Sequence, residues 1–136
     1  MRAIALLAAV LFALASPAAA DDLTAAHAQD VIRAQEQAFS RDDAAAAYSH
    51  AAPGIRQMFP QADIFMSMVQ QSYAPVYRHR SFEFGEARNE GDRVAQRVNI
   101  VDANGEAWEA LYTLERQADG SFKITGCSLR KAGQAV

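Results

Sequence analysis

The sequence predicts an α+β fold in which N-terminal helices pack on a four-stranded antiparallel meander. Apolar residues recur at helical spacing in the first half of the chain, whereas the second half alternates at period two between turn sequences, with the boundary close to Pro75. A sheet with one apolar face must be covered, and amphipathic helices in the same chain provide that cover. A two-layer domain is therefore the expected architecture.

The N-terminus has the pattern of a secretory signal peptide. Arg2 supplies a positive charge, residues 3–15 are apolar and uncharged, and Ser16 and Pro17 interrupt this run shortly before Ala20. We expect cleavage after Ala20 and a periplasmic or secreted product. The apolar run is shorter than the roughly 20 residues of a membrane-spanning helix, and no cysteine lies near the cleavage point for a lipid. The product is expected to have no membrane anchor.

Residues 1–20 are thus assigned to the signal peptide and residues 21–136 to one α+β domain. Without Arg2, the domain has 12 basic and 16 acidic residues, dispersed along the chain, which excludes the basic surface that nucleic acid binding requires. Cys127 is the only cysteine, so no intramolecular disulfide can form. We expect a buried, inert thiol, with an intermolecular bridge as the alternative.

Three helices are expected before the sheet. Thr24 is the expected N-cap of the first, and Asp42 the expected cap of a short second helix that Pro53 ends. After a connecting segment, Pro60 starts the third helix and Pro75 stops it. The expected helices are residues 24–41, residues 44–48 and the segment between the last two prolines.

Four strands follow, separated by turn sequences rich in Asn, Asp and Gly. The expected strands are residues 79–88, 93–101, 106–117 and 121–130. Each is expected to alternate at period two, which places one set of side chains on a common apolar face. That set is Phe82 and Phe84; Val94, Gln96, Val98 and Ile100; Trp108, Ala110, Tyr112 and Leu114; and Phe122 and Ile124.

Several segments of the chain carry a resemblance to known proteins: Ala38-Phe39, Asp42-Asp43, residues 52–59, residues 68–78, residues 96–98, residues 102–105, Trp108 and residues 119–127. They resemble one family of short exported bacterial proteins, domain of unknown function 4864. Phe122 stands where the family pattern has tryptophan. The resemblance implies a cone like that of nuclear transport factor 2, in which helices close over a strongly curved antiparallel sheet. It implies no activity, because this fold serves isomerases, cyclases and non-catalytic binding modules alike.

In such a cone a ligand would lie between the helices and the sheet, so polar groups on apolar surfaces are the candidate ligand-binding residues. They are Arg56, Tyr73, Tyr77, Gln96 and Tyr112. Arg56 could bind a carboxylate or phosphate, or it is a surface arginine, alone or paired with Asp63 or Glu109. The hydroxyls of Tyr73 and Tyr77 could bind a ligand or an oxyanion, or these side chains plug the junction between helix and strand.

Proton-transfer chemistry has weak support. Glu109 follows the inward-facing Trp108 in its strand, so it is expected on the outer face of the sheet. Glu83 follows Phe82 and is expected on the outer face for the same reason. His27, His50 and His79 are far apart without a second ligand at i+2 to i+4, so no metal site or cofactor is expected.

His79 lies between Arg78 and Arg80, which predicts a solvated basic strand start with a disfavoured imidazolium. The function predicted from the sequence is an exported non-catalytic domain that binds a small ligand or a protein, with a homodimer through the outer sheet face as one option. The alternative is a small cone-fold enzyme, an isomerase, cyclase or dehydratase, that uses the polar groups of the pocket.

Overall fold

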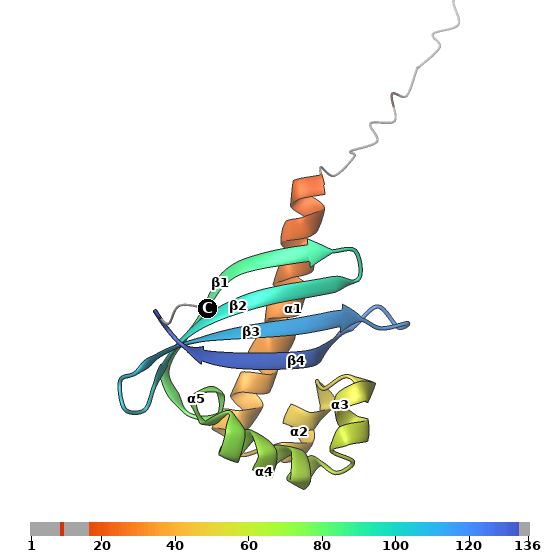
Figure 1. The fold of residues 1–136 in the computed structure, drawn as a ribbon. Coiled ribbons are helices and arrows are strands. Elements are labelled where there is room, and N and C mark those ends of the chain that lie inside the picture. The colour runs from red at the N-terminus through yellow and green to blue at the C-terminus, as the bar shows by residue number, and fades with distance from the viewer. Residues whose placement is uncertain (1–8, 10–16, 134–136) are drawn as a thin grey trace, which may run out of the picture.

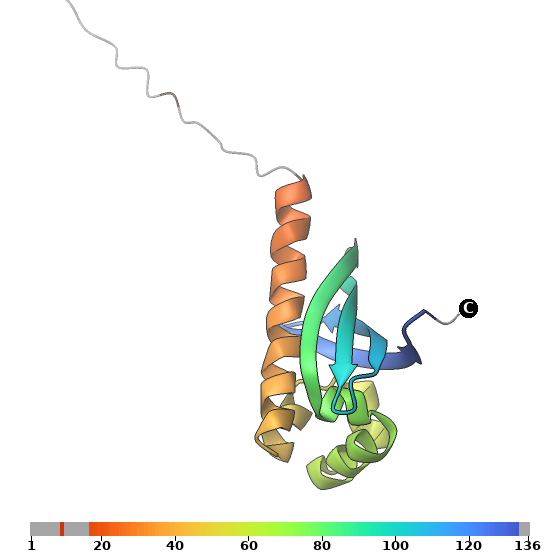
Figure 2. The same cartoon turned by 90° about the vertical axis from the view of Figure 1, so that its left-hand side faces the viewer.

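The computed structural model describes residues 17–133 and the isolated residue 9, and it contains a helical layer beside one antiparallel sheet (Figures 1 and 2). The helices are α1 (Pro17–Ser40), α2 (Ala44–Ser49), α3 (Pro53–Met58), α4 (Ala62–Ser72) and α5 (Ala74–Tyr77). The strands are β1 (His79–Glu90), β2 (Arg93–Asp102), β3 (Ala107–Arg116) and β4 (Phe122–Lys131), in the order β1-β2-β3-β4. The α+β prediction of helices on a four-stranded meander is confirmed.

Helix α1 crosses the inner face of the sheet, and α2 to α5 gather at one end of it (Figure 1). Of the buried residues of α1, Ala28, Ile32, Gln35 and Phe39 recur at i, i+4, i+7 and i+11 and, with Ala38, form the stripe that faces the strands. The prediction that Thr24 caps this helix is wrong, because α1 begins at Pro17, whose fixed φ suits the first helical position. Among the described residues, no helix is long and apolar enough to span a membrane.

The end of α1 forms a Schellman motif with Asp42 in the left-handed conformation, at φ 57°. The Asp42 N–H donates to the Phe39 carbonyl at 3.1 Å, and the Asp43 N–H donates to the Ala38 carbonyl at 2.9 Å. The predicted capping role belongs to the next residue, since the Asp43 carboxylate accepts from the Ala46 N–H at 3.0 Å. Asp42 instead accepts from Arg78 at 2.7 Å and from the Tyr77 hydroxyl, which ties α1 to α5.

Two prolines that were expected to end helices begin them. Pro53 is the first residue of α3, and this helix occupies the segment predicted to be a connection after α2. Pro75 lies in the first turn of α5, because α4 ends at Ser72 and a new helical turn starts at Ala74. The third predicted helix also starts later than expected, at Ala62 rather than at Pro60. Proline lacks the N–H that a first helical turn does not use, so both roles are compatible with it.

The apolar inner face of the sheet is the one that alternation predicts, and its members are buried or partly buried. Strict alternation fails at three shifts of register, two in β1, between His79 and Ser81 and between Phe84 and Ala87, and one in β4 at Thr125. A bulge adds an unpaired residue and bends its strand. Figure 2 shows the resulting curvature, with β1 arched along α1.

Gln96 is the fully buried polar residue of the inner face, with 0% of its surface exposed. Its Nε2 donates to the Gly85 carbonyl at 2.9 Å and to the Arg97 carbonyl at 2.8 Å, and its Oε1 accepts from Gln29 Nε2 at 3.0 Å. Gly85 lies within the β1 bulge, where the ladder is interrupted. Gln96 therefore satisfies a carbonyl that the bulge releases and links the sheet to α1.

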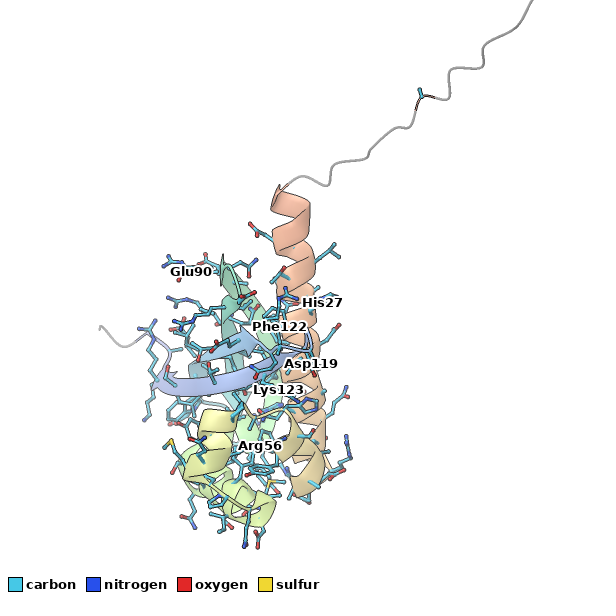
Figure 3. The ribbon with its side chains drawn as sticks, turned by 90° about the vertical axis from the view of Figure 1, so that its right-hand side faces the viewer. His27, Arg56, Glu90, Asp119, Phe122 and Lys123 are labelled. Carbon is cyan, nitrogen blue, oxygen red and sulfur yellow. The ribbon has the colours of Figure 1, made fainter. Side chains whose placement is uncertain are left out.

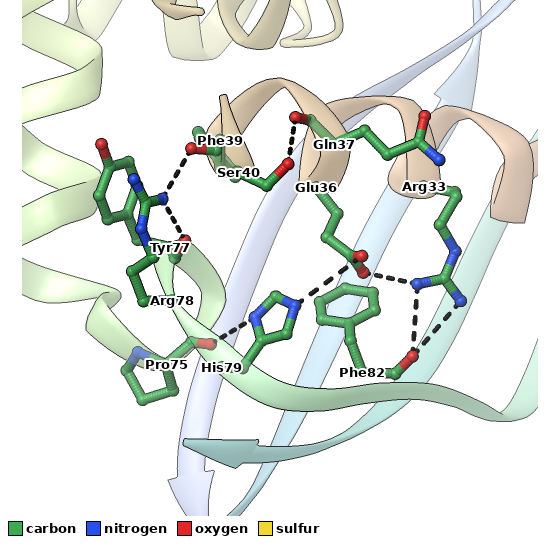
Figure 4. A network of polar contacts seen from close by, with 10 residues as sticks. All are labelled: Arg33, Glu36, Gln37, Phe39, Ser40, Pro75, Tyr77, Arg78, His79 and Phe82. Carbon is green, nitrogen blue, oxygen red and sulfur yellow. Dashed lines mark hydrogen bonds and ion pairs between the residues drawn. The ribbon is translucent and has the colours of Figure 1, made fainter. Parts of the chain in front are cut away.

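A polar cluster joins α1 to the start of β1 (Figure 4). Glu36 accepts from Arg33 at 2.6 Å and lies 3.8 Å from Nε2 of His79, whose Nδ1 is 3.0 Å from the Pro75 carbonyl. Both ring nitrogens thus face oxygen acceptors, which suits the doubly protonated ring. The Glu36 carboxylate raises the pKa of His79, opposed by burial. The predicted solvated histidine with a disfavoured imidazolium is therefore wrong.

Replacing Gln96 with Met is expected to lower the free energy of unfolding by about 2 kcal/mol or more. Methionine fills a similar volume but leaves the Gly85 and Arg97 carbonyls without this donor inside the core. Urea unfolding measures the change. The control is Asn99→Met, on the exposed face of the same strand, which is expected to change stability by less than about 0.5 kcal/mol. Equal effects of the two changes would contradict this role for Gln96.

Replacing His79 with Gln is expected to remove a stabilisation that acts at low pH. Because the folded-state pKa lies above the ordinary 6.5, the stabilisation is complete below pH 6.5 and disappears as the pH rises through the raised pKa. Urea unfolding at about pH 5.5 and about pH 8.5 should give a larger difference between wild type and variant at the lower pH. His27→Gln, at an exposed position of α1, should show no such trend. A difference that is the same at both pH values would refute the role of His79.

Candidate functional site

A cavity of about 260 Å³ lies between the helical layer and the end of the sheet formed by β3 and β4. Most of its wall is apolar and comes from four helices and two strands. The lining residues are Gln35 and Phe39 of α1; Ile55, Met58 and Phe59 of α3 and its C-cap; Phe65, Met68 and Val69 of α4; Tyr73 and Val76; Tyr112 of β3; and Ile124, Thr125, Gly126 and Cys127 of β4. The cavity occupies the place where the cone was expected to hold a ligand.

The bulge in β4 explains why this space is not filled. Ile124 pairs with Leu114 and Cys127 pairs with Tyr112, so both face inward although they are three positions apart. Between them lie the bulged Thr125 and Gly126, and neither places a large side chain in the core. At one edge of this space the Ala52 N–H donates to the Ile124 carbonyl at 2.8 Å, which fixes the start of α3 against β4.

Four polar side chains, all buried or half-buried, are part of this mostly apolar wall. They are Gln35, Tyr73, Tyr112 and Cys127. Burial raises the pKa of Tyr73 and raises that of Tyr112 well above the ordinary value, with a further contribution to both from Cys127. Burial also raises the pKa of the Cys127 thiol to about 12, opposed by a hydrogen bond with Tyr112. At neutral pH these groups are uncharged.

The lining contains no carboxylate, imidazole or cation among the residues that the structure describes. Glu109 lies on the outer face, as predicted, where it accepts from Arg130 at 2.8 Å and pairs with Arg97 at 3.8 Å. Within residues 17–133 no cluster of three or more potential metal ligands occurs. The cavity therefore offers neutral hydrogen-bonding groups to a ligand and no general acid or base that titrates near neutral pH.

Arg56 and Tyr77 lie outside the cavity lining. Arg56 is exposed on α3, among the short helices in Figure 3, with its guanidinium 4.9 Å from the centre of the Tyr48 ring. It donates to the Tyr48 carbonyl at 3.3 Å and pairs with neither Asp63 nor Glu109. The Tyr77 hydroxyl contacts Asp42 and accepts from Gln70 Nε2 at 3.1 Å. Both side chains fasten neighbouring helices.

Tyr73 and Tyr112 do line the cavity, whereas Gln96 is enclosed by its bonds to β1 and Gln29. The sequence reasoning missed Gln35 as a lining residue. A signal for it was present, since Gln35 falls between Ile32 and Phe39 on the apolar stripe of α1. A polar residue in such a stripe indicates either a buried hydrogen bond or a cavity.

A family model described as "Domain of unknown function (DUF4864)" matches residues 21–135. The chain belongs to this family. A crystal structure of an NTF-2 like protein of unknown function from Silicibacter pomeroyi DSS-3 is similar to it, with a TM-score of 0.57 and 15% sequence identity. The match covers 82% of this chain and 98% of the other. At this identity the likeness shows the fold alone, and it confirms the predicted NTF-2-like architecture. No curated protein matches the chain.

Cys127 of the folded DUF4864 domain is expected to react far more slowly with iodoacetamide than Cys127 of the unfolded chain. A rise in pKa from 9.0 to about 12 corresponds to about a thousandfold smaller thiolate fraction. Reaction rates at one pH, with and without urea, measure the difference. The control carries Cys127→Ser and Ser128→Cys, which places the single thiol on the exposed face of β4. Equal rates for native and unfolded wild type would contradict the buried position.

Proposed function

We propose that this protein is an exported, non-catalytic binding module that holds a small, neutral and largely apolar ligand in the cavity between α4 and β4. The observation that carries this proposal is the combination of open volume with neutrality. About 260 Å³ is available, and every ionisable group on the wall has a pKa raised away from neutral pH. An apolar ligand is stabilised in such a space because its surface leaves water and the wall has no charged group that would lose its hydration.

The volume limits the size of the ligand. Small-molecule sites usually measure about 300 to 1,000 Å³, and an engineered apolar cavity of about 150 Å³ takes up benzene. The cavity near β4, at about 260 Å³, lies between these values. It suits a substituted single ring or a short aliphatic chain, and Phe39, Phe59 and Phe65 supply aromatic surface for such a molecule.

Support for export comes from residues 1–20, of which the structure describes only residue 9 and the first turn of α1. Residues 1–8 and 10–16 lie outside the described part of the chain. Cleavage after Ala20 would remove residues 17–20 from α1 and leave Asp21 and Asp22 in its new first turn. Acidic side chains are favourable there, because they face the positive end of the helix dipole. The predicted homodimer through the outer sheet face stays a prediction.

The alternative enzyme, an isomerase, cyclase or dehydratase of the cone fold, would need a proton acceptor beside the ligand. Catalytic acids and bases work best when their pKa lies near the operating pH. The pKa values of Tyr73, Tyr112 and Cys127 are all raised, which takes them further from neutral pH. The geometry of the wall thus favours binding over proton transfer.

Filling the cavity is expected to abolish ligand uptake without unfolding the domain. Met68 is partly exposed and lines the cavity, so Met68→Trp adds volume on the ligand side of α4. Titration calorimetry with propylbenzene and 4-propylphenol should detect binding to the wild type and at least about tenfold weaker binding to this variant. Both compounds should also raise the melting temperature of the wild type.

The matched control is Ile64→Trp, which adds the same bulk to an exposed position of α4 outside the lining. It should bind both compounds as the wild type does. Binding that is equally weakened in both variants would place the ligand elsewhere. The absence of binding to the wild type by either compound would overturn the proposed function.

A further inference from the structure

We infer that the ligand of this cavity carries a hydroxyl group on an otherwise apolar, uncharged body, and that Gln35 and Tyr112 recognise that hydroxyl. This inference rests on the proposed function and names the chemical class of its ligand. It comes from two polar side chains that are almost completely buried, line the cavity and each keep one hydrogen-bonding atom without a strong partner inside the protein. Gln35 is 4% exposed and Tyr112 is 2% exposed.

The amide orientation of Gln35 is fixed by its one hydrogen bond. Nε2 donates to the Ala47 carbonyl at 3.1 Å, and because a carbonyl can only accept, the amide nitrogen must be the atom that faces Ala47. Oε1 accepts from no residue in the described part of the chain, and the side chain lines the cavity. Among the described residues the fully enclosed side-chain atom without a partner is Asn89 Oδ1, so Gln35 Oε1 is open to the cavity, where a ligand that donates a hydrogen bond can reach it.

Tyr112 presents the complementary group. Its hydroxyl interacts with the Cys127 thiol, which is a weak hydrogen-bonding partner. Burial raises the pKa of Tyr112 well above its ordinary value, so the O–H remains a donor at any physiological pH. The side chain lines the cavity, so its hydroxyl can donate to a ligand oxygen in place of this weak thiol partner.

Charges around the site select against an anion. Neither lysine nor arginine lines the cavity within the described residues, so a ligand carboxylate would find no counter-ion. The Glu36 carboxylate acts on Tyr112 through its charge and contributes to raising the pKa of that tyrosine. A second negative charge beside it would be repelled. The site therefore favours a neutral group over a carboxylate or phosphate.

One hydroxyl both donates and accepts, so it is the smallest group that offers a partner to Gln35 Oε1 and to the Tyr112 O–H, which line the same cavity. A ketone could only accept and would leave Gln35 unpaired, and an alkane would serve neither group. Sites built to hydrogen-bond a ligand hydroxyl reject analogues that lack it, since the buried polar groups then stay unpaired. The ligand class is thus a small alcohol or phenol with an apolar remainder.

Calorimetric titration with three compounds of similar shape tests the inference. 4-Propylphenol carries the hydroxyl, propylbenzene lacks it, and 4-propylbenzoate replaces it with a charge. At neutral pH the wild type should bind 4-propylphenol about tenfold more tightly than propylbenzene, the fold-change expected for one net hydrogen bond. It should bind 4-propylbenzoate more weakly than either.

Two variants assign the preference to the named residues. Tyr112→Phe removes only the hydroxyl, and Gln35→Met removes the acceptor at similar volume; each should bring the two neutral compounds to similar affinity. The control is Tyr48→Phe, whose hydroxyl donates to the Phe59 carbonyl at 2.7 Å outside the cavity, and it should keep the tenfold preference. Circular dichroism shows that each variant is folded before titration. If Gln35→Met fails to fold, Tyr112→Phe alone decides.

The outcomes separate the inference from the proposed function. If propylbenzene binds as tightly as 4-propylphenol, or if Tyr112→Phe keeps the preference, the hydroxyl inference is overturned while apolar binding stands. If 4-propylbenzoate binds most tightly, the requirement for a neutral ligand is overturned. If none of the three compounds binds to the wild type, the proposed function itself fails.

Discussion

Covering the apolar inner face of the sheet is the constraint on which the rest of the structure depends. Ile100, Val98 and Leu114 on this face are at most 1% exposed, and so are Ile32 and Phe39 of α1, which lie against it. One long helix covers only a stripe of a curved sheet, so the remaining area has to be covered by shorter helices at one end (Figure 1). The short helices α2 to α5 and the turns between them complete the cover of the inner face.

The bulges that curve the sheet account for both the buried amide of Gln96 and the cavity. The β1 bulge leaves carbonyl groups inside the core without a partner in the sheet. Gln96 Nε2 donates to the Gly85 carbonyl there, and Gln96 Oε1 accepts from Gln29 of α1. The β4 bulge at Thr125 leaves an inward gap between Ile124 and Cys127 that the helices do not fill. Bends in strands therefore decide where this core is polar and where it is hollow. A flat sheet of the same sequence pattern would need neither Gln96 nor the open volume.

Sequence patterns were sufficient to predict the strands, because alternation at period two shows directly which side chains share a face. They were insufficient where one residue type has two roles. Pro53 can end one helix or begin the next, and only its position against β4 shows that it begins α3. His79 was expected to repel a proton because of its sequence neighbours, yet Glu36 reaches it from α1. The bulge at Thr125 depends on pairing with Thr113 and Leu114, which the strand itself does not encode. Gln35 was missed although its position on the apolar stripe of α1 was a signal, whereas the predicted Tyr73 and Tyr112 line the cavity.

The distribution of charge around the cavity is consistent with the proposed binding of a neutral ligand. At the end of the fold that holds the cavity, Asp42 pairs with Arg78, and Glu36 pairs with Arg33 and His79. Each of these groups connects α1 to α5 or β1, and none lines the cavity. The ionisable side chains thus hold the helical cover in position from outside, and the wall itself keeps neutral groups. An enzyme that moves protons would place such a carboxylate or imidazole against the ligand, whereas a site for a neutral molecule is stabilised by keeping them behind the wall.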